Sequence, residues 1–182
     1  MILLVAATEA ELCGHPGLVC GVGPVEAAAA TARALAESRP EAVLHVGLAG
    51  CRRGCGLEVG GLVVGSEAVY DDVVIALAPR RVAPDLRLVA AAREAVPGAA
   101  FVPIGTSGTV GGTRGHDVEA MEGFAVLRAA ELARVPAVEV RAIANEIEEE
   151  DRARWRFEDA LAALAQALPP LTASITAARP AR

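Results

Sequence analysis

Polar side chains stand at the ends of apolar segments in this chain, where they could reach a ligand. The run 138–143 is rich in β-branched residues and predicts a strand, with Arg141 inside it and Asn145 just beyond it. Glu122 belongs to an earlier segment, 117–123, which also predicts a strand end. Ligands of open α/β sheets bind beyond the carboxyl ends of the strands, so these side chains are candidates for one cleft. A salt-bridged arginine and a turn-forming asparagine are the alternative.

A second source of carboxylates follows the amino-terminal apolar run. Residues 1–7 predict a buried strand, and Thr8-Glu9-Ala10-Glu11 comes directly after it. Only one of Glu9 and Glu11 needs to face the cleft.

Two segments of small residues also follow predicted strands. The strand 41–46 runs into Gly47-Leu48-Ala49-Gly50, and the strand 99–104 runs into a loop, 105–113, rich in glycine and hydroxyl groups. Small residues allow a ligand to approach the backbone closely, which makes Ala49 and Gly50 candidate binding residues. A plain tight turn and a flexible linker are the alternatives.

Other polar residues predict no metal or cofactor site. His45 lies inside an apolar run and is expected to be a hydrogen-bonded core histidine. Asp71-Asp72 is expected to form a solvated turn or an interface. The four cysteines lack the spacing and the additional ligands of a zinc site, so reduced thiols are expected. The turn 21–24 lacks the third glycine of a dinucleotide site. We therefore expect no metal and no cofactor.

Length and composition indicate one compact domain over residues 1–182. The chain is 53% hydrophobic but only 3% aromatic, so alanine, valine and leucine must fill its core. Its net charge of −6 argues against a nucleic-acid partner, because phosphate binding relies on clustered lysine and arginine. No apolar run approaches the length of about 20 residues needed to cross a bilayer, and the amino terminus does not resemble a signal peptide. A cytoplasmic protein without a membrane partner is expected.

Strands and helices alternate along the chain, and these elements must position the candidate residues. Besides the strands already named, 17–22 and 61–70 predict strands, and helices are predicted at 25–38, 84–96, 123–134 and 157–168. This order predicts an α/β protein, a three-layer α/β/α sandwich around a central mixed, mostly parallel sheet.

Six short motifs occur in an order that resembles a known superfamily. They are Thr8-Glu9-Ala10-Glu11, residues 21–28, residues 45–50, residues 58–64, Met121-Glu122-Gly123 and residues 140–145. In this order they resemble the purine nucleoside phosphorylase and methylthioadenosine/adenosylhomocysteine nucleosidase superfamily over nearly the whole chain. The segments 109–113, 121–126 and 151–161 are similar to those of futalosine hydrolases within it. The resemblance implies a nucleoside phosphorylase-like fold and cleavage of a purine nucleoside.

The resemblance also implies a role for several residues. Glu11 takes the position of the glutamate that activates the attacking water, and a carboxylate there also stabilises the sugar cation. Glu122 would bind the ribose hydroxyls and Met121 would pack against the sugar. Arg141 would hold a carboxylate of the site in place. The loop residues Thr109 and Val110 would contact the base.

One position departs from the adenine-specific nucleosidases of this superfamily. Where those enzymes carry an aspartate that protonates N7 of adenine, this chain has Asn145. An amide cannot protonate a leaving group, but it can hydrogen-bond N7 and the 6-oxygen of a 6-oxopurine. This difference favours an inosine-type nucleoside, and futalosine in particular, over methylthioadenosine.

Several alternatives remain open from the sequence. A phosphorylase would need arginines around its phosphate, and only Arg52 and Arg53 keep that reading open. Ala144, where the nucleosidases usually carry serine, gives slight support to a nucleoside-binding protein that has lost catalysis. Trp155 is expected either to stack on the substrate or to fill the core. The resemblance further implies a homo-oligomer, a dimer or larger, whose partner completes the pocket.

Overall fold

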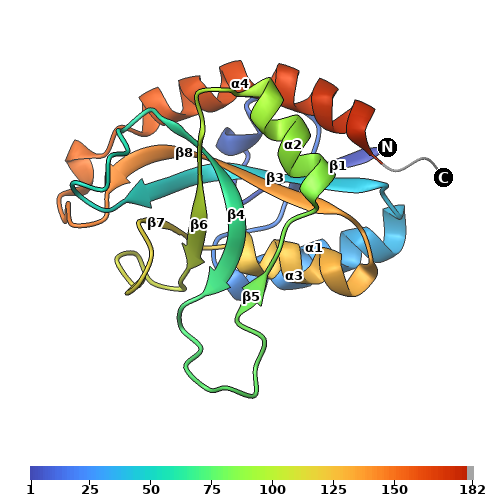
Figure 1. Cartoon of the computed structure of the whole chain (residues 1–182), viewed down its shortest axis with the longest axis horizontal. Coiled ribbons are helices and arrows are strands. Elements are labelled where there is room, and N and C mark those ends of the chain that lie inside the picture. Colours follow the sequence, from blue (N-terminus) through green and yellow to red (C-terminus); the bar gives the residue numbers. More distant parts are fainter. Residues whose placement is uncertain (180–182) are drawn as a thin grey trace.

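A mixed sheet with helices on both sides forms the body of the protein (Figure 1). The computed structural model describes residues 1–179. The strands are β1 (Ile2–Ala6), β2 (Leu18–Val19), β3 (Ala42–Cys51), β4 (Leu62–Tyr70), β5 (Arg81–Val82), β6 (Ala100–Thr106), β7 (Val118–Ala120) and β8 (Ala137–Glu146). The helices are η1 (Ala10–Leu12), α1 (Pro24–Ser38), α2 (Leu86–Ala95), α3 (Gly123–Ala133), η2 (Arg152–Arg154) and α4 (Phe157–Ala178).

The sheet closes on itself. Strand β3 pairs with β8, β8 with β4, β4 with β6, β6 with β7, and β7 again with β3. Strands β1 and β2 extend the sheet beyond β3, and β5 extends it beyond β4. Most of these pairs are parallel; β3–β7, β4–β5 and β4–β8 are antiparallel. The predicted α/β class with a mixed, mostly parallel sheet is confirmed, but the sheet is a closed ring and not the flat middle layer of a sandwich.

Three clusters of buried side chains match this architecture. The largest packs α2 and α4 against β1, β3 and β8, and the second packs α1 and α3 against the opposite side. The third draws on all five strands of the ring, with Ala49, Val63, Ile104, Val118 and Ile143 among its members. Small and β-branched side chains therefore fill the ring, as the low aromatic content requires.

Several element ends follow the local signals in the sequence. Pro24 occupies the first turn of α1, where its missing N–H costs no hydrogen bond. The Asp85 side chain caps α2 by accepting hydrogen bonds from the N–H groups of Arg87 and Leu88. Strand β3 runs to Cys51 and β8 to Glu146. The residues 47–50 and Asn145, predicted to follow strands, therefore lie inside them.

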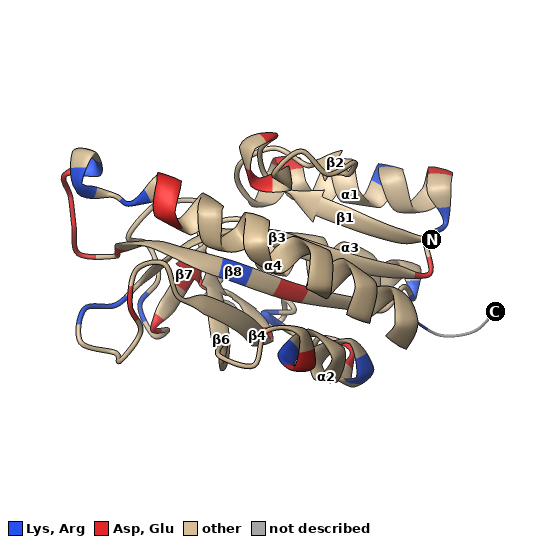
Figure 2. Cartoon of the chain, turned by 90° about the horizontal axis from the view of Figure 1, so that it is seen from above, with Lys and Arg blue, Asp and Glu red and all other residues tan. Residues whose placement is uncertain are grey.

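Helix α4 is longer than predicted and continues through Pro169 and Pro170. With 22 residues and a mean hydropathy of 1.3, it is long and apolar enough to cross a membrane by length and composition. The expectation that the chain has no such segment was wrong, because the proline pair does not end the helix. In this structure α4 lies across β8 and contacts α2, β3 and β8, with few charged residues along its length (Figure 2).

Burial of one α4 face predicts a stability difference between two leucines. Leu171 is fully buried in the α2–α4 cluster, whereas Leu86 on α2 is 79% exposed. Leu171→Ala should lower the free energy of unfolding by about 2–5 kcal/mol, and Leu86→Ala by less than about 0.5 kcal/mol. Urea denaturation measures both. Equal effects would contradict the packing of α4 onto the sheet.

Candidate active site

A cavity of about 400 Å³ opens where β1, β3, β7 and β8 end beside the start of α4. Most of the predicted site residues line it: Glu11, Ala49, Gly50, Val110, Met121, Glu122, Asn145 and Trp155. Two predicted contact residues, Thr109 and Arg141, do not form part of this lining. The cavity thus brings together residues from both ends of the chain.

Glu11 is held in place by three hydrogen bonds. The chain after β1 does not stay extended but turns into η1, which directs Glu11 into the protein while Glu9 stays exposed. The Thr8 backbone N–H and hydroxyl donate to Glu11 Oε2 at 2.9 and 2.8 Å, and the Leu48 N–H donates to Oε1 at 2.8 Å. The side chain is nearly buried at 7% exposure, so its carboxylate is fixed at the cavity wall.

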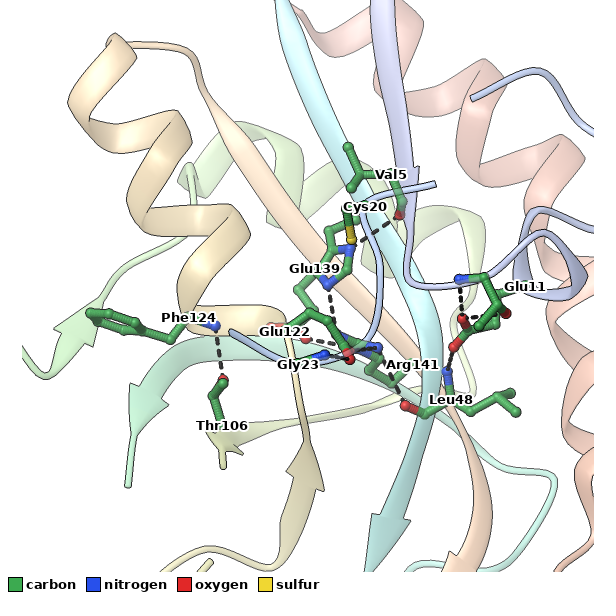
Figure 3. A network of polar contacts seen from close by, with 12 residues as sticks. Val5, Glu11, Cys20, Gly23, Leu48, Thr106, Glu122, Phe124, Glu139 and Arg141 are labelled. Carbon is green, nitrogen blue, oxygen red and sulfur yellow. Dashed lines mark hydrogen bonds and ion pairs between the residues drawn. The ribbon is translucent and has the colours of Figure 1, made fainter. Parts of the chain in front are cut away.

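Glu122 stands at the start of α3, on another wall of the cavity. Its Oε1 accepts a hydrogen bond from the Gly23 N–H at 3.0 Å, and its Oε2 lies 3.3 Å from Arg141 Nη1 (Figure 3). Gly23 is the residue before α1, so the carboxylate joins the amino-terminal ends of two helices. These contacts fix the Glu122 carboxylate at the cavity wall.

Arg141 lies behind the cavity wall and is completely buried. Its Nε donates to Glu139 Oε1 at 2.7 Å, its Nη1 pairs with Glu122, and its Nη2 lies 2.6 Å from His45 Nε2. Burial by itself would lower the pKa of Arg141, but the carboxylates of Glu139, Glu122 and Glu11 outweigh it and raise that pKa. The predicted direct contact of Arg141 with a ligand is therefore not seen, whereas its implied role of holding a carboxylate fits the geometry.

Glu139 and His45 complete the environment of the guanidinium. Burial raises the pKa of Glu139, while the charge and the hydrogen bond of Arg141 act in the opposite direction. His45 Nδ1 lies 3.1 Å from the Val5 carbonyl oxygen, which makes Nδ1 the donor and leaves Nε2 to accept from Arg141. His45 is thus the hydrogen-bonded core histidine that the sequence predicted.

Gly47 explains how two of these charged groups approach each other. Gly47 pairs with Arg141 in the β3–β8 register. A Cβ atom at this position would collide with Arg141 Nη1 and would lie 2.7 Å from Glu11 Oε1. The absence of a side chain at Gly47 therefore allows the guanidinium and the Glu11 carboxylate to lie over the same peptide.

Asn145 reaches the cavity through an irregularity in β8. The register with β3 shifts between Ala49 and Gly50, so that Ala49 pairs with Ile143 and Gly50 pairs with Asn145. The intervening Ala144 is the extra residue of a bulge, and such bulges redirect side chains at functional sites. The Asn145 Nδ2 donates to the Glu146 carbonyl oxygen at 2.9 Å. The side chain is 8% exposed and faces the cavity beside Gly50.

The loop after β6 contributes one wall, and its anchor is a residue that the sequence analysis missed. Glu119 on β7 accepts hydrogen bonds from the N–H groups of Gly111 and Thr113, and its side chain lines the cavity. Val110, at the tip of this loop, faces the cavity, but Thr109 lies on its outer side. In the sequence, Glu119 could have been found as an acidic residue two positions before Met121.

Asp71 and Asp72 form a turn after β4, with Asp72 exposed, and both also anchor the same loop. Asp72 accepts hydrogen bonds from the Ser107 hydroxyl at 2.9 Å and the Gly108 N–H at 2.7 Å. Asp71 pairs with the Thr113 hydroxyl and with His116 Nδ1. The sequence analysis predicted a solvated turn or an interface, and it did not show these contacts because the partners lie 35 to 45 residues further along the chain.

Trp155 enters the cavity wall just before α4. Its Nε1–H donates to the Glu149 carbonyl oxygen at 2.9 Å, and its ring lies 5.5 Å from that of Phe157. Both rings line the cavity, so Trp155 both packs against the protein and presents a surface to a ligand.

Comparison with known proteins identifies the family. A family model described as "Phosphorylase superfamily" matches residues 12–178. The chain belongs to the phosphorylase superfamily. A futalosine hydrolase of Streptomyces coelicolor is 34% identical over 90% of this chain and 80% of that protein.

Solved structures of this superfamily share the fold. A methylthioadenosine/adenosylhomocysteine nucleosidase of Colwellia psychrerythraea in complex with adenine is 22% identical, with a TM-score of 0.79 over 98% of this chain and 95% of that one. A nucleosidase of Helicobacter pylori is 16% identical, with a TM-score of 0.83 over 94% and 97%. These similarities show the fold.

The arginines that a phosphate-using member of the superfamily would need are engaged elsewhere. Arg52 Nη1 lies 3.3 Å from Glu148, and Arg53 Nε lies 2.7 Å from Glu146. Neither residue lines the cavity. In residues 1–179 all four cysteines are free thiols, and no cluster of His, Cys, Asp or Glu could hold a metal ion.

The burial of His45 predicts a pH dependence of stability in this superfamily member. Burial, and then the charge of Arg141, hold the pKa of His45 well below its usual value. The unfolded chain therefore takes up a proton below about pH 6.5 that the folded protein does not, and the stability present above that pH is lost as the pH falls. His45→Asn should flatten this loss between pH 7 and pH 5 by as much as about 1.4 kcal/mol per pH unit.

Urea denaturation at pH 7, 6 and 5 measures this slope for each protein. His15→Asn is the control, because His15 lies in the loop before β2 and outside this network. Identical slopes for the wild-type protein and His45→Asn would contradict the burial of a neutral His45.

Proposed function

We propose that this protein is an N-ribosyl hydrolase that cleaves the glycosidic bond of a 6-oxopurine nucleoside, with futalosine as the substrate and hypoxanthine as the released base. The observation that carries this proposal is the placement of Glu11, Glu122 and Asn145 on the walls of one cavity. A futalosine hydrolase is the curated relative, and the relatives of solved structure cleave or bind purine nucleosides by their names. We propose further that this reaction belongs to menaquinone biosynthesis, as the resemblance to futalosine hydrolases implies.

The bond-breaking step follows from the carboxylates. The bond between N9 and C1′ breaks as the sugar gains oxocarbenium character, and water attacks C1′. Glu11 takes the proton of this water, and its charge stabilises the sugar cation. Glu122, fixed by Gly23 and Arg141, accepts hydrogen bonds from the ribose hydroxyls, with Met121 against the sugar.

A hydrogen bond stabilises the leaving base. The hypoxanthine anion spreads its charge onto the 6-oxygen, so a hydrogen bond at N7 suffices where adenine needs a proton. Asn145 supplies an amide at the cavity wall for that purpose. Ala49, Gly50 and Val110 provide close backbone and apolar contact, and Trp155 a flat surface. This chemistry requires neither a metal nor a cofactor.

One experiment distinguishes hydrolysis from phosphorolysis. The purified protein is incubated with futalosine, inosine or methylthioadenosine, with and without phosphate, and the released base is measured. Hypoxanthine released without phosphate supports the proposal. Strict phosphate dependence would indicate a phosphorylase, and no release from any nucleoside would indicate a binding protein.

Substitution of Glu11 tests the proposed base. Glu11→Gln preserves the shape of the side chain but removes the group that takes the proton, so kcat should fall by about 10²-fold or more. Nucleoside binding, measured by calorimetry, should change little. Glu9→Gln is the matched control, because Glu9 lies two residues away and is exposed. Unchanged turnover in Glu11→Gln would remove Glu11 from the mechanism.

Substitution of Asn145 tests base recognition. Asn145→Asp introduces an acid that can protonate N7, so the ratio of kcat/KM for 6-aminopurine nucleosides to that for 6-oxopurine nucleosides should rise by about tenfold or more. The comparison uses inosine and adenosine with both proteins. An unaltered ratio would contradict the contact between Asn145 and the base.

We further propose that the protein is a homo-oligomer. An apolar groove of about 550 Å³ lies between α1 and α3, flanked by Val25, 76% exposed, and Leu132, 69% exposed. Close by, the loop after β4 exposes Val74, Ile75 and Leu77. Apolar surface gathered in this way is typical of an interface between protein chains.

Sedimentation equilibrium tests the oligomer. The wild-type protein should give the mass of a dimer or larger assembly, and Leu132→Glu should shift it toward the monomer because a charge enters the apolar groove. Leu86→Glu, at an exposed site on α2, should leave the mass unchanged. A monomeric wild-type protein would contradict the proposal.

Cytoplasmic location and the absence of nucleic-acid and membrane partners stay predictions from the sequence.

A further inference from the structure

Glu139 is a buried acid for which the proposed mechanism has no role. It lies on β8, two residues before Arg141, is fully buried, and does not line the cavity. A buried carboxylate is costly unless its oxygens are paired, and Glu139 Oε2 has no hydrogen-bond partner within residues 1–179. The position of Glu139 therefore requires an explanation.

Arg141 is held by different residues at its three side-chain nitrogens. Its Nε donates to Glu139 Oε1 at 2.7 Å, and its Nη2 lies 2.6 Å from His45 Nε2. Its Nη1 faces Glu122 Oε2 and the Leu48 carbonyl oxygen, each at 3.3 Å. The guanidinium is planar and its N–H groups point in fixed directions. The contacts at Nε and Nη2 therefore decide where Nη1 points.

The Glu139 carboxylate also lies against the backbone that carries Glu122. Gly123 follows Glu122 and is the first residue of α3. A Cβ atom at Gly123 would collide with both carboxylate oxygens of Glu139. The carboxylate thus sits at the amino-terminal end of α3, where the helix dipole favours an acid. Glu139 therefore supports Glu122 from two directions, through Arg141 and through the backbone at Gly123 (Figure 3).

We propose that Glu139 is a positioning residue for Glu122, the carboxylate assigned to the ribose hydroxyls. This inference rests on the proposed function and adds to it the residue that fixes the geometry of ribose binding. Glu139 acts through the length of its side chain, because Oε1 must reach the Arg141 Nε–H to fix the plane of the guanidinium. A shorter side chain at this position leaves a gap behind the guanidinium and lets Nη1 move away from Glu122.

Ribose binding without hydrolysis measures this role. One ligand is a C-nucleoside analogue of inosine, in which carbon replaces N9 so that the bond to C1′ cannot be hydrolysed. The other is its 2′,3′-dideoxy form, which lacks the hydroxyls assigned to Glu122. Calorimetry gives both dissociation constants. The wild-type protein should bind the ribose form at least about tenfold more tightly, because hydrogen bonds to a charged group discriminate by that factor or more.

Two substitutions separate the length of the Glu139 side chain from its carboxylate. Glu139→Asp keeps the carboxylate but is one methylene shorter, so the preference for the ribose form should shrink by about tenfold. Glu139→Gln replaces the carboxylate by an amide but keeps an oxygen for the Arg141 Nε–H, so the preference should stay within about threefold of the wild-type value.

Two further variants serve as controls. In a Glu122→Gln background, Glu139→Asp should change the preference no further, because its effect passes through Glu122. Leu171→Ala controls for a general loss of stability, since Leu171 is fully buried in the α2–α4 cluster and does not line the cavity. It should leave the preference for the ribose form unchanged.

Three outcomes would overturn the inference. If Glu139→Asp weakens both ligands by one common factor, Glu139 has a structural role only. If neither substitution changes the preference, Glu139 does not position Glu122. If Glu139→Gln shrinks the preference as much as Glu139→Asp, the length of the side chain is not what matters. Failure of the proposed function is seen separately, as absence of nucleoside hydrolysis by a wild-type protein that still prefers the ribose form.

Discussion

One buried guanidinium organises the functional end of this protein. Arg141 is inaccessible to solvent and contacts Glu122, Glu139 and His45. A cation in this position would be costly alone, and the carboxylates around it would be costly without it. Arg141 pairs with both Glu139 and Glu122, and through the second pair it holds Glu122 at the cavity wall. The carboxylate that lines the cavity thus owes its position to a residue that does not line it.

The backbone also contributes to the geometry of the site. Gly47 allows Arg141 and Glu11 to lie over one peptide, and the missing side chain of Gly50 leaves room for the Asn145 amide, whose Nδ2 would lie 3.0 Å from a Cβ atom there. The shape of this site therefore depends on the two glycines as well as on the polar side chains. The β8 bulge then brings a polar group to the cavity.

Local signals made much of the fold predictable from the sequence. β-branched runs marked the strands, Pro24 and Asp85 marked helix starts, and the order of the motifs placed Glu11, Glu122 and Asn145 in one site. The sequence did not show which strands pair when they lie far apart along the chain. The three residues of β7 close the ring only because β3 and β6 flank them. Likewise, burial of Leu171 and Ile175 carries α4 past a proline pair that local rules treat as a stop.

A crystal structure of Glu11→Gln with bound futalosine would test the central claim most directly. The account predicts that the Glu122 carboxylate contacts the ribose hydroxyls while Arg141 stays behind it, bonded to Glu122 and Glu139. It also predicts that the base lies against Asn145. A guanidinium that turns to contact the nucleoside itself, or a nucleoside bound outside this cavity, would contradict the account.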